Sequence, residues 1–594
     1  MSKNQKSMGA EPSRRKFLRS TVAGSAAGLA GISSFAVSDA HAAGKWDQEA
    51  DILVVGTGAA ASSAAITAAQ SGSSVIMVEK APVYGGTSAK ADGGMWVPNN
   101  RFMRAQGKAD SRNDALRYMA RCARPHLYRA DDPQFGMPES EFKLLEAFYD
   151  NSSKAFEFLE GIGALKTTAV LSLPDYYDSA PENKAPQGRM IMSERPDGQF
   201  GPGLELIRQL KAWVDSKKIP VLLKHRVRNL VRNDKGEVVG LEATNANGDV
   251  VLLRARKAVI FATGGFSHNQ ELIRNFQPGP VYGACAVPSA EGDFVAIAQT
   301  AGAKLGNMVN AWRMQLVLDH SLEMRSVPKG IWQPPGDSMI MVNKYGERVV
   351  NEKHNYHDRS RVHFNWDANR EEYPNQFLFM VYDRRVEELF GGNFPLPAPG
   401  AGAPYVISGN TLEELGQAIQ ARLDQNVKKV GEVRLKGFAQ NLAKTITTFN
   451  RYAQTGNDEQ FQRGEFRWDK EWQVYTSIPR SGTSWKTDEM PSKTMHPFQA
   501  EGPYFAIILA PGVLDTNGGP VINPVAQVMD ASNRPIPGLY GAGNCISSPA
   551  AQSYWGAGPT LSLAITFGHL AGVNAAKESA KDASHIQAAG NRRK

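Results

Sequence analysis

The clearest hydrophobic pattern in the chain is a short apolar run that leads directly into glycines. Residues 51–55 form a continuous, largely β-branched run after an initial aspartate, which predicts a buried parallel strand. Small residues fill positions 62–71 and predict a closely packed helix, and the apolar run at 74–78 predicts the next strand. Strand, glycine turn, helix and strand in this order predict a βαβ unit.

Two later apolar runs repeat the same transition from strand to glycine. Residues 258–262 lead into Thr263-Gly264-Gly265, and residues 538–540 lead into Gly541-Ala542-Gly543. Residues 559–576 predict a helix that carries proline in its first turn, where no intrahelical N–H is needed. Glycine turns so far apart in the sequence predict one extended ligand bound by a discontinuous domain.

The first glycine turn has the spacing of a dinucleotide-binding fingerprint. Gly56 allows the tight turn, Gly58 lets the backbone approach a pyrophosphate, and Ala61 allows close packing of the helix on the strand. The N–H groups at the start of the helix then face the phosphates. Glu79 ends the second strand and is placed to accept from ribose hydroxyls, which argues against a 2′-phosphate. FAD and NAD remain, and the dispersed glycine turns favour extended FAD.

The N-terminus has the pattern of an export signal. Arg14 and Arg15 precede an uncharged Ala/Gly-rich stretch at 20–38, and Ala40-His41-Ala42 is a small-x-small cleavage pattern. We expect residues 1–42 to be a twin-arginine signal peptide and the protein to be periplasmic or extracytoplasmic, with an uncleaved membrane anchor as the alternative. Cleavage removes six basic and two acidic residues, which lowers the formal net charge from +8 to +4.

Composition excludes several classes of protein. The 594 residues are 42% hydrophobic and 21% charged, which are ordinary globular values. Cys122, Cys285 and Cys545 are too few for a disulfide scaffold and form no C-x-x-C motif. We expect no metal site, because no residues have the spacing of metal ligands. We expect no nucleic-acid partner and no transmembrane segment in the mature chain, because it has neither a basic stripe nor a long apolar helix.

Several further motifs carry a resemblance to a known superfamily. They are Gly85-Gly86-Thr87-Ser88, Glu291-Gly292-Asp293, and the segments 346–352, 515–519 and 542–544. With the fingerprint, they make residues 50–576 resemble the flavoproteins of the fumarate reductase/succinate dehydrogenase superfamily. The resemblance implies an α/β fold in which a Rossmann-like, discontinuous FAD-binding domain is interrupted by an inserted α+β capping domain. The implied parts are 46–275 and 496–578 for FAD binding, 276–495 for the cap, and a flexible tail at 579–594.

The C-terminal segment selects a branch of this superfamily. Tyr554 lies where fumarate reductases have an arginine, and Leu514-Asp515 replaces their histidine pair, so a dicarboxylate substrate would lack its clamp. The same segment resembles the 3-ketosteroid Δ1-dehydrogenases. That resemblance implies that Tyr554 and Gly558 bind the 3-keto oxygen and that Tyr356 is the catalytic base. An auxiliary tyrosine would be Tyr176 or Tyr177, and the sequence does not choose between them.

The function implied is an FAD-dependent dehydrogenase that introduces a C=C bond next to a ketone, with α-proton abstraction by Tyr356 and hydride transfer to flavin N5. A 3-oxosteroid is the favoured substrate, and an external molecule accepts the electrons. The alternatives are a desaturase of a smaller cyclic ketone, an enone or alkene reductase, and a flavin-bearing binding protein without turnover. Tyr356 could also be a packing residue, and residues 554–558 a plain helix-entry turn.

The FAD is expected to be bound non-covalently. The residues expected to bind it are Gly56, Gly58, Ala59, Ala60, Glu79, Lys80, Gly85, Gly86, Thr87, Ser88, Gly93, Gly94, Thr263, Gly264, Asp293, Gly543, Asn544, Pro559 and Leu561.

Overall fold

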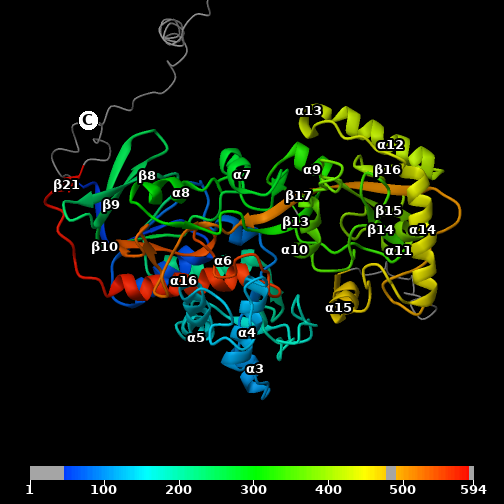
Figure 1. Cartoon of the computed structure of the whole chain (residues 1–594). Coiled ribbons are helices and arrows are strands. Elements are labelled where there is room, and N and C mark those ends of the chain that lie inside the picture. Colours follow the sequence, from blue (N-terminus) through cyan, green and yellow to red (C-terminus); the bar gives the residue numbers. More distant parts are fainter. Residues whose placement is uncertain (1–45, 329, 477–489, 588–594) are drawn as a thin grey trace, which may run out of the picture. The chain divides into compact units, whose positions relative to one another are not determined.

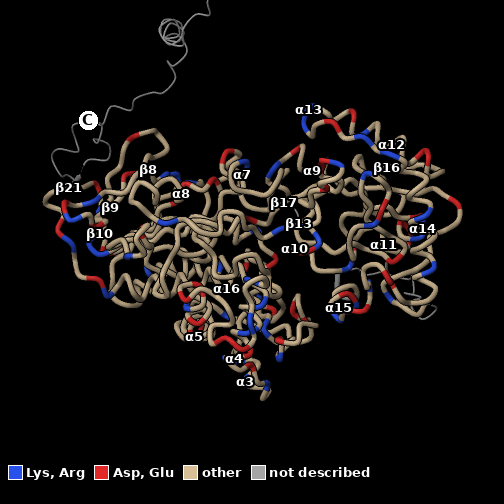
Figure 2. The backbone as a smooth tube through the Cα atoms, viewed as in Figure 1, with Lys and Arg blue, Asp and Glu red and all other residues tan. Residues whose placement is uncertain are grey.

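The computed structural model describes residues 46–328, 330–476 and 490–587, and the described residues belong to one compact unit that begins at Trp46. The expected signal peptide at 1–42 lies outside the described residues. Among the helices that are described, none has both the length and the apolar composition that crossing a membrane requires. Lysine and arginine alternate with acidic residues along the chain in Figure 2.

The main sheet carries the predicted βαβ unit (Figure 1). Its strands follow the order β21 (Ile586–Gln587), β8 (Arg226–Asn233), β9 (Val238–Thr244), β10 (Val250–Phe261), β1 (Gln48–Val55), β2 (Val75–Val78) and β7 (Val221–Leu222), with β20 (Pro535–Gly541) paired to β10 and β19 (Gln527–Met529) paired to β20. Strands β10, β1, β2 and β7 run parallel, with Val54 opposite both Ile260 and Met77. The predicted α/β fold class is confirmed, since the strands at 51–55, 74–78 and 258–262 all lie in this sheet.

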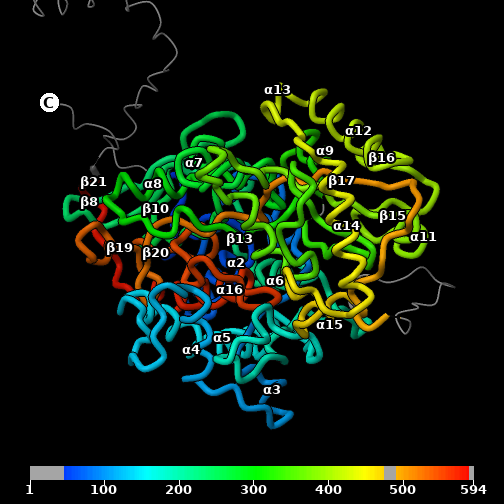
Figure 3. The backbone as a smooth tube through the Cα atoms, turned by 45° about the vertical axis from the view of Figure 1, so that its right-hand side comes forward, coloured from blue at the N-terminus to red at the C-terminus, as the bar shows by residue number. Residues whose placement is uncertain are grey.

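Helix α2 (Ala59–Gln70) follows the first glycine turn and packs on α16 (Pro559–Ala576), as Figure 3 shows. Both helices are rich in small residues at the contact. A Cβ at Gly568 would lie 2.3 Å from the Ala60 carbonyl oxygen, so only glycine permits this approach. The Ser63 hydroxyl donates to the Ile565 carbonyl at 2.8 Å. The helix predicted at 559–576 is confirmed, and the helix predicted at 62–71 begins three residues earlier than expected because Gly58 is its N-cap.

A second sheet is built mainly from strands between residues 283 and 516. Its strands are β11 (Gly283–Ala284), β17 (Tyr504–Thr516), β15 (Leu378–Asp383) and β14 (Met339–Val342), and β13 (Ala311–Val317) and β16 (Val406–Gly409) also pair with β17. The predicted cap ends at residue 495, yet β17 pairs with strands from the cap along its whole length. The segment predicted as a tail from residue 579 contains β21, which pairs with β8. The domain boundaries themselves stay predictions.

The remaining elements complete the described chain. The small sheets comprise β3 (Met95–Trp96), β4 (Thr167–Ala169), β5 (Met190–Glu194) and β6 (Phe200–Gly201), and β12 (Leu305–Gly306) with β18 (Gly519–Pro520). The other helices are η2 (Gly86–Lys90), α3 (Arg101–Ala105), α4 (Arg112–Ala123), α5 (Glu139–Gly161), α6 (Gly203–Ser216), α7 (Gln270–Phe276), α8 (Asp293–Thr300), α9 (Leu318–Glu323), α10 (Tyr356–Arg359), η3 (Ser360–Phe364), α11 (Arg384–Phe390), α12 (Leu412–Gln425), α13 (Val427–Val430), α14 (Phe438–Thr455), α15 (Arg467–Thr476) and η5 (Gly543–Cys545).

A buried ion-pair network stabilises the segment that precedes α10. Arg348 makes a bidentate pair with the Glu352 carboxylate, with both distances 2.8 Å, and it also pairs with Asp458 at 2.8 Å. Arg463 reaches the same Glu352 carboxylate at 3.2 Å. All of these side chains are almost fully buried, so removal of one partner would leave an uncompensated charge in the core.

Candidate active site

A cavity of about 640 Å³ lies where the main sheet meets the second sheet. The carboxyl ends of β1, β10 and β20 contribute their glycine turns to its wall, and Trp312 of β13 and Asp515 of β17 come from the other sheet. Ligands bind at the carboxyl ends of parallel strands in open α/β sheets, so the position of this cavity is the one that the topology predicts.

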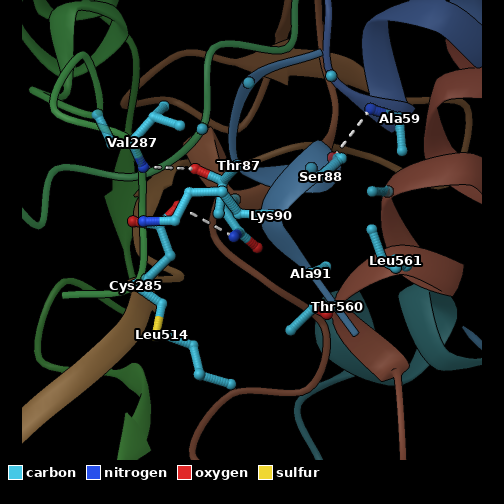
Figure 4. Close-up of a pocket in the computed structure, with 18 of the residues that line it drawn as sticks. Ala59, Thr87, Ser88, Lys90, Ala91, Cys285, Val287, Leu514, Thr560 and Leu561 are labelled. Atoms are coloured by element: carbon cyan, nitrogen blue, oxygen red, sulfur yellow. Dashed lines mark hydrogen bonds between the residues drawn. The ribbon is translucent and has the colours of Figure 1, made fainter. Parts of the chain in front are cut away.

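The glycine turn after β1 needs its glycines. Gly56 has φ +108°, and a Cβ there would lie 2.4 Å from the Ala262 carbonyl oxygen. Gly58 is the N-cap of α2, and the first N–H of that helix, on Ala59, donates to the Ser88 hydroxyl at 3.0 Å (Figure 4). Gly56, Gly58 and Ala60 line the cavity, so the turn borders the space that a pyrophosphate would occupy.

The carboxylate of Glu79, the residue after β2, accepts hydrogen bonds from neighbouring groups. The Thr57 hydroxyl donates to Glu79 at 2.8 Å, and the Ala81 N–H donates to the other carboxylate oxygen at 2.8 Å. Lys80 pairs at 2.9 Å with both Glu291 and Asp293. These contacts fix the carboxylate that would meet a ribose and bring the Glu291-Gly292-Asp293 turn next to it.

The structure brings most of the expected FAD-binding residues to the cavity wall. Those that line it are Gly56, Gly58, Ala59, Ala60, Glu79, Lys80, Gly86, Thr87, Ser88, Gly93, Gly94, Thr263, Gly264, Asp293, Gly543, Asn544 and Leu561. Gly85 and Pro559 do not line it. Gly85 packs against Ile207 and has φ +114°, so its role is in the turn, and Pro559 begins α16 without an N–H.

The donor set fits FAD. Thr560 and Leu561 line the cavity from the first turn of α16, where backbone N–H groups have no intrahelical acceptor and the helix dipole is positive. The glycine turn of β1 and Glu79 line the part of the wall that suits a pyrophosphate and a ribose, and the Gly543–Asn544 turn lies beside α16. FAD has a phosphate bridge in its middle and an electron-accepting ring at one end. It can therefore place the phosphates at the glycine turn of β1 and the ring near α16.

Three tyrosines converge at the wall of the cavity. The Tyr176 hydroxyl donates to the Tyr356 hydroxyl at 2.7 Å, and the Tyr554 hydroxyl bonds with Tyr356 and with Thr560. The Tyr176 and Tyr554 rings are stacked, with centroids 5.2 Å apart and an interplanar angle of 9°. The Tyr356 ring stands edge-on to both of them. Tyr356 is the first residue of α10, where the Asn355 side chain caps the turn by accepting from the Asp358 N–H.

Gly558 completes this group. It has φ +99°, and a Cβ there would lie 2.0 Å from the Gly94 carbonyl oxygen, so glycine is required. Within the described ranges its N–H has no protein acceptor, and the residue lines the cavity. Tyr554 and Gly558 line the same cavity, and they are the two donors from which an oxyanion hole for a carbonyl oxygen would be built.

Burial sets the protonation of these phenols. It raises the pKa of Tyr554 to about 12 and raises the pKa of Tyr356 well above its usual value of 10. Tyr356 can act as a base only when a donor stabilises its phenolate, and the Tyr176 hydroxyl is such a donor. Burial also lowers the pKa of His357 to about 4, so its ring is neutral near pH 7. His357 bonds instead to the Arg313 N–H and the Gln552 carbonyl.

The structure distinguishes the two adjacent tyrosines. Tyr176 lines the cavity, and Tyr177 does not. The Tyr177 hydroxyl interacts with Asp358 of α10, whereas the Tyr176 hydroxyl donates to Tyr356 of the same short helix. Tyr176 is therefore the one that is placed to assist Tyr356.

The sequence analysis did not identify many of the other residues that line the cavity. Those residues include Lys90, Met190, Met192, Cys285, Trp312, Trp332, Gln333, Phe394 and Trp472. Trp312 stands edge-on to Tyr554 with centroids 5.1 Å apart, and its indole N–H donates to Asn544 at 3.0 Å. Asp515 accepts from Asn544 and from the Gly265 N–H, so it ties the two sheets together at the cavity. Gly292, Leu514 and Asp515 also line the cavity, and they lay in motifs that the sequence analysis had noted without expecting them at the site.

Comparisons with known proteins agree with the fold described above. The FAD binding domain family matches residues 51–561. A 4-oxocyclohexanecarboxylate 2-dehydrogenase of Sinomonas cyclohexanicum is 29% identical over 89% of this chain and 93% of its own length. A 3-oxosteroid 1-dehydrogenase of Mycolicibacterium smegmatis is 27% identical over 90% of this chain and 98% of its own. The crystal structure of 3-ketosteroid Δ1-dehydrogenase from Sterolibacterium denitrificans, in complex with 1,4-androstadiene-3,17-dione, has the same fold, with a TM-score of 0.74 and 24% identity over 89% of this chain and 99% of that one.

Proposed function

This chain belongs to the FAD binding domain family, and we propose that it desaturates a cyclic ketone next to the carbonyl group, with a 3-oxosteroid as the favoured substrate. It is an FAD-dependent oxidoreductase of the dehydrogenase type. The single observation that carries the proposal is the convergence of Tyr176, Tyr356, Tyr554 and the Gly558 N–H on one wall of the cavity.

In the proposed reaction, the Tyr554 hydroxyl and the Gly558 N–H hold the carbonyl oxygen and stabilise the negative charge that develops there. This makes the α proton acidic enough for the phenolate oxygen of Tyr356 to remove it, while the Tyr176 hydroxyl donates to that oxygen. Bound FAD supplies the acceptor for the hydride that leaves the β carbon. The aromatic rings around these groups exclude water from the reacting atoms.

The wall of the cavity supports an apolar substrate. Trp332, Phe394 and Trp472 contribute aromatic surface, and Met190 and Met192 contribute adaptable apolar surface. No arginine lines the cavity within the described ranges, so a guanidinium clamp for a dicarboxylate is absent from that part of the wall. This favours ketone desaturation over the reduction of a fumarate-like alkene.

The test uses the purified holoprotein under anaerobic conditions. We expect 4-androstenedione to bleach the absorbance of the oxidised flavin, and we expect Tyr356→Phe to abolish bleaching without loss of bound FAD. Tyr177→Phe is the matched control, because its hydroxyl bonds with Asp358 outside the cavity. If no cyclic ketone bleaches the flavin but an enone reoxidises the reduced enzyme, the reductase alternative replaces this proposal.

A second candidate is a smaller cyclic ketone that carries a carboxylate. The observation that favours it is Lys90, which lines the cavity and donates to the neutral Ser326 hydroxyl and Val327 carbonyl. Figure 4 shows Lys90 between the turn that carries Thr87 and the segment of Cys285 and Val287. If the ammonium pairs with the substrate, Lys90→Met will slow flavin reduction by 4-oxocyclohexanecarboxylate but not by its methyl ester. Equal slowing with both compounds would reject this pairing.

We also propose that the protein is exported by the twin-arginine route and that it passes electrons to an external acceptor. The paired Arg14-Arg15, the Ala/Gly-rich stretch and the cleavage pattern at Ala42 support export. This route carries folded proteins, which suits a cofactor that is bound by turns from both ends of the chain.

A further inference from the structure

A buried charged cluster lies behind the segment that presents Tyr176. Arg189 is fully buried and makes a bidentate pair with Asp110, at 2.7 and 2.9 Å. Its other terminal nitrogen reaches the Asp175 carboxylate at 2.5 Å and the Asn183 side-chain oxygen at 2.9 Å. The guanidinium also lies over the Trp96 ring, 5.1 Å from the ring centroid. One cation therefore binds two carboxylates in a site that is almost fully buried.

Asp175 links this cluster directly to the reacting tyrosines, because it is the residue before Tyr176. Its second carboxylate oxygen accepts from the Trp96 indole N–H at 2.8 Å, and its backbone N–H donates to the Pro186 carbonyl at 2.8 Å. The Tyr176 N–H then donates to the Trp555 carbonyl, next to Tyr554, at 3.1 Å. The backbone on both sides of the Tyr176 side chain is thus fixed.

We propose that Arg189 and Asp175 are positioning residues that hold the Tyr176 hydroxyl against the Tyr356 hydroxyl. The proposal rests on the proposed function, in which Tyr176 stabilises the phenolate of Tyr356. The two hydroxyl oxygens are 2.7 Å apart, and a displacement of the Tyr176 ring by a fraction of that distance would remove the hydrogen bond. Neither positioning residue touches the substrate.

The cluster contains groups that titrate, so the position of the Tyr176 side chain should depend on pH. Burial raises the pKa of Asp175 to about 6, although the nearby Arg189 acts in the opposite direction. Around Asp175 the titratable groups are Arg189 and Asp110 within the cluster, Tyr118 and Cys122 of α4, and Tyr176 itself. When the pH falls through about 6, Asp175 gains a proton, its ion pair with Arg189 is lost, and the hold on Tyr176 weakens.

The test compares three variants of the holoenzyme. We expect Asp175→Asn and Arg189→Lys to slow flavin reduction by ketone roughly 10- to 100-fold, with little change in the ketone concentration at half-saturation. The wild-type rate should fall below about pH 6, and Asp175→Asn should lack this acidic limb. Hydrogen exchange measured by mass spectrometry on a peptide that spans residues 170–189 should be faster in both variants. This last readout does not depend on turnover.

Asp110→Asn is the matched control, because it removes charge from the same cluster without adjoining Tyr176. We expect it to lower the unfolding temperature while the rate of flavin reduction stays near the wild-type value. Equal slowing in Asp110→Asn and Asp175→Asn would overturn the proposal, as would faster exchange at 170–189 with an unchanged rate. If the wild-type flavin is not reduced by any ketone, the proposed function fails, and faster exchange would still support the anchoring of Tyr176.

Discussion

The substitution Tyr554→Phe isolates one hydroxyl group of the site. The Tyr554 ring is stacked on Tyr176 and stands edge-on to Trp312, so a phenylalanine ring should keep the same place. What is lost is the hydroxyl that, in the proposed reaction, donates to the substrate oxygen. These ring contacts do not involve the hydroxyl, so the change is local.

The expected decrease in the rate of flavin reduction follows from the loss of that hydrogen-bond donor. Removal of one oxyanion-hole donor costs about 3–4 kcal/mol in the barrier, which corresponds to roughly 100- to 1000-fold in rate. In the free enzyme the same hydroxyl bonds with Tyr356 and Thr560, so folding should lose only about 1 kcal/mol. We therefore expect a large kinetic defect in a protein that still folds and binds FAD.

The assay is anaerobic stopped-flow measurement of flavin reduction at saturating ketone. Flavin content and unfolding temperature are measured on the same preparation, and Tyr177→Phe is the control, since it loses a hydroxyl outside the cavity. A decrease of less than about tenfold in Tyr554→Phe, with FAD retained, would refute the reasoning that this hydroxyl is an oxyanion donor. So would an equal decrease in the control variant.

Three further predictions concern the cofactor, acid stability and export. Glu79→Ala should weaken FAD binding to the apoprotein about tenfold in a fluorescence titration, because the ribose loses its acceptor, and unchanged affinity would contradict this role. Although burial acts against it, the two arginine partners of Glu352 lower its pKa to about 2, so about 3 kcal/mol of stability should be lost as the pH falls from 4.5 through 2. Glu352→Gln should flatten this dependence in unfolding curves. Replacement of Arg14 and Arg15 by lysine should keep the protein out of the periplasmic fraction, and N-terminal sequencing of the exported wild type should begin at Ala43.

The sequence predicted the parts of the site that depend on local backbone geometry. Gly56 and Gly558 could be identified because each lies in a turn with positive φ, a local conformation that favours glycine. The helix at 559–576 was predicted to the residue, with proline at its first position as the start signal. These signals are contained in a few consecutive residues.

The sequence could not predict contacts that form between distant loops. Tyr176 and Tyr177 are neighbours of the same type, and only the path of their segment decides that one faces the cavity and the other faces Asp358. Trp332 and Phe394 meet the cavity from irregular segments that have no hydrophobic period. The membership of β17 in the second sheet likewise depends on long-range strand pairing.

The close packing of α2 on α16 has a consequence for the order of events during synthesis. The Ser63 hydroxyl and the Ile565 carbonyl that it contacts are separated by 502 positions in the chain. A ribosome that adds about 5–20 residues per second needs roughly 25–100 s to pass from one to the other. Throughout this interval the fingerprint turn has no α16 to pack against, so the nascent chain must stay free of aggregation with its cofactor site open. The cofactor site is complete only after α16 has been synthesised, so we expect the supply of FAD at that moment to affect the yield of active enzyme.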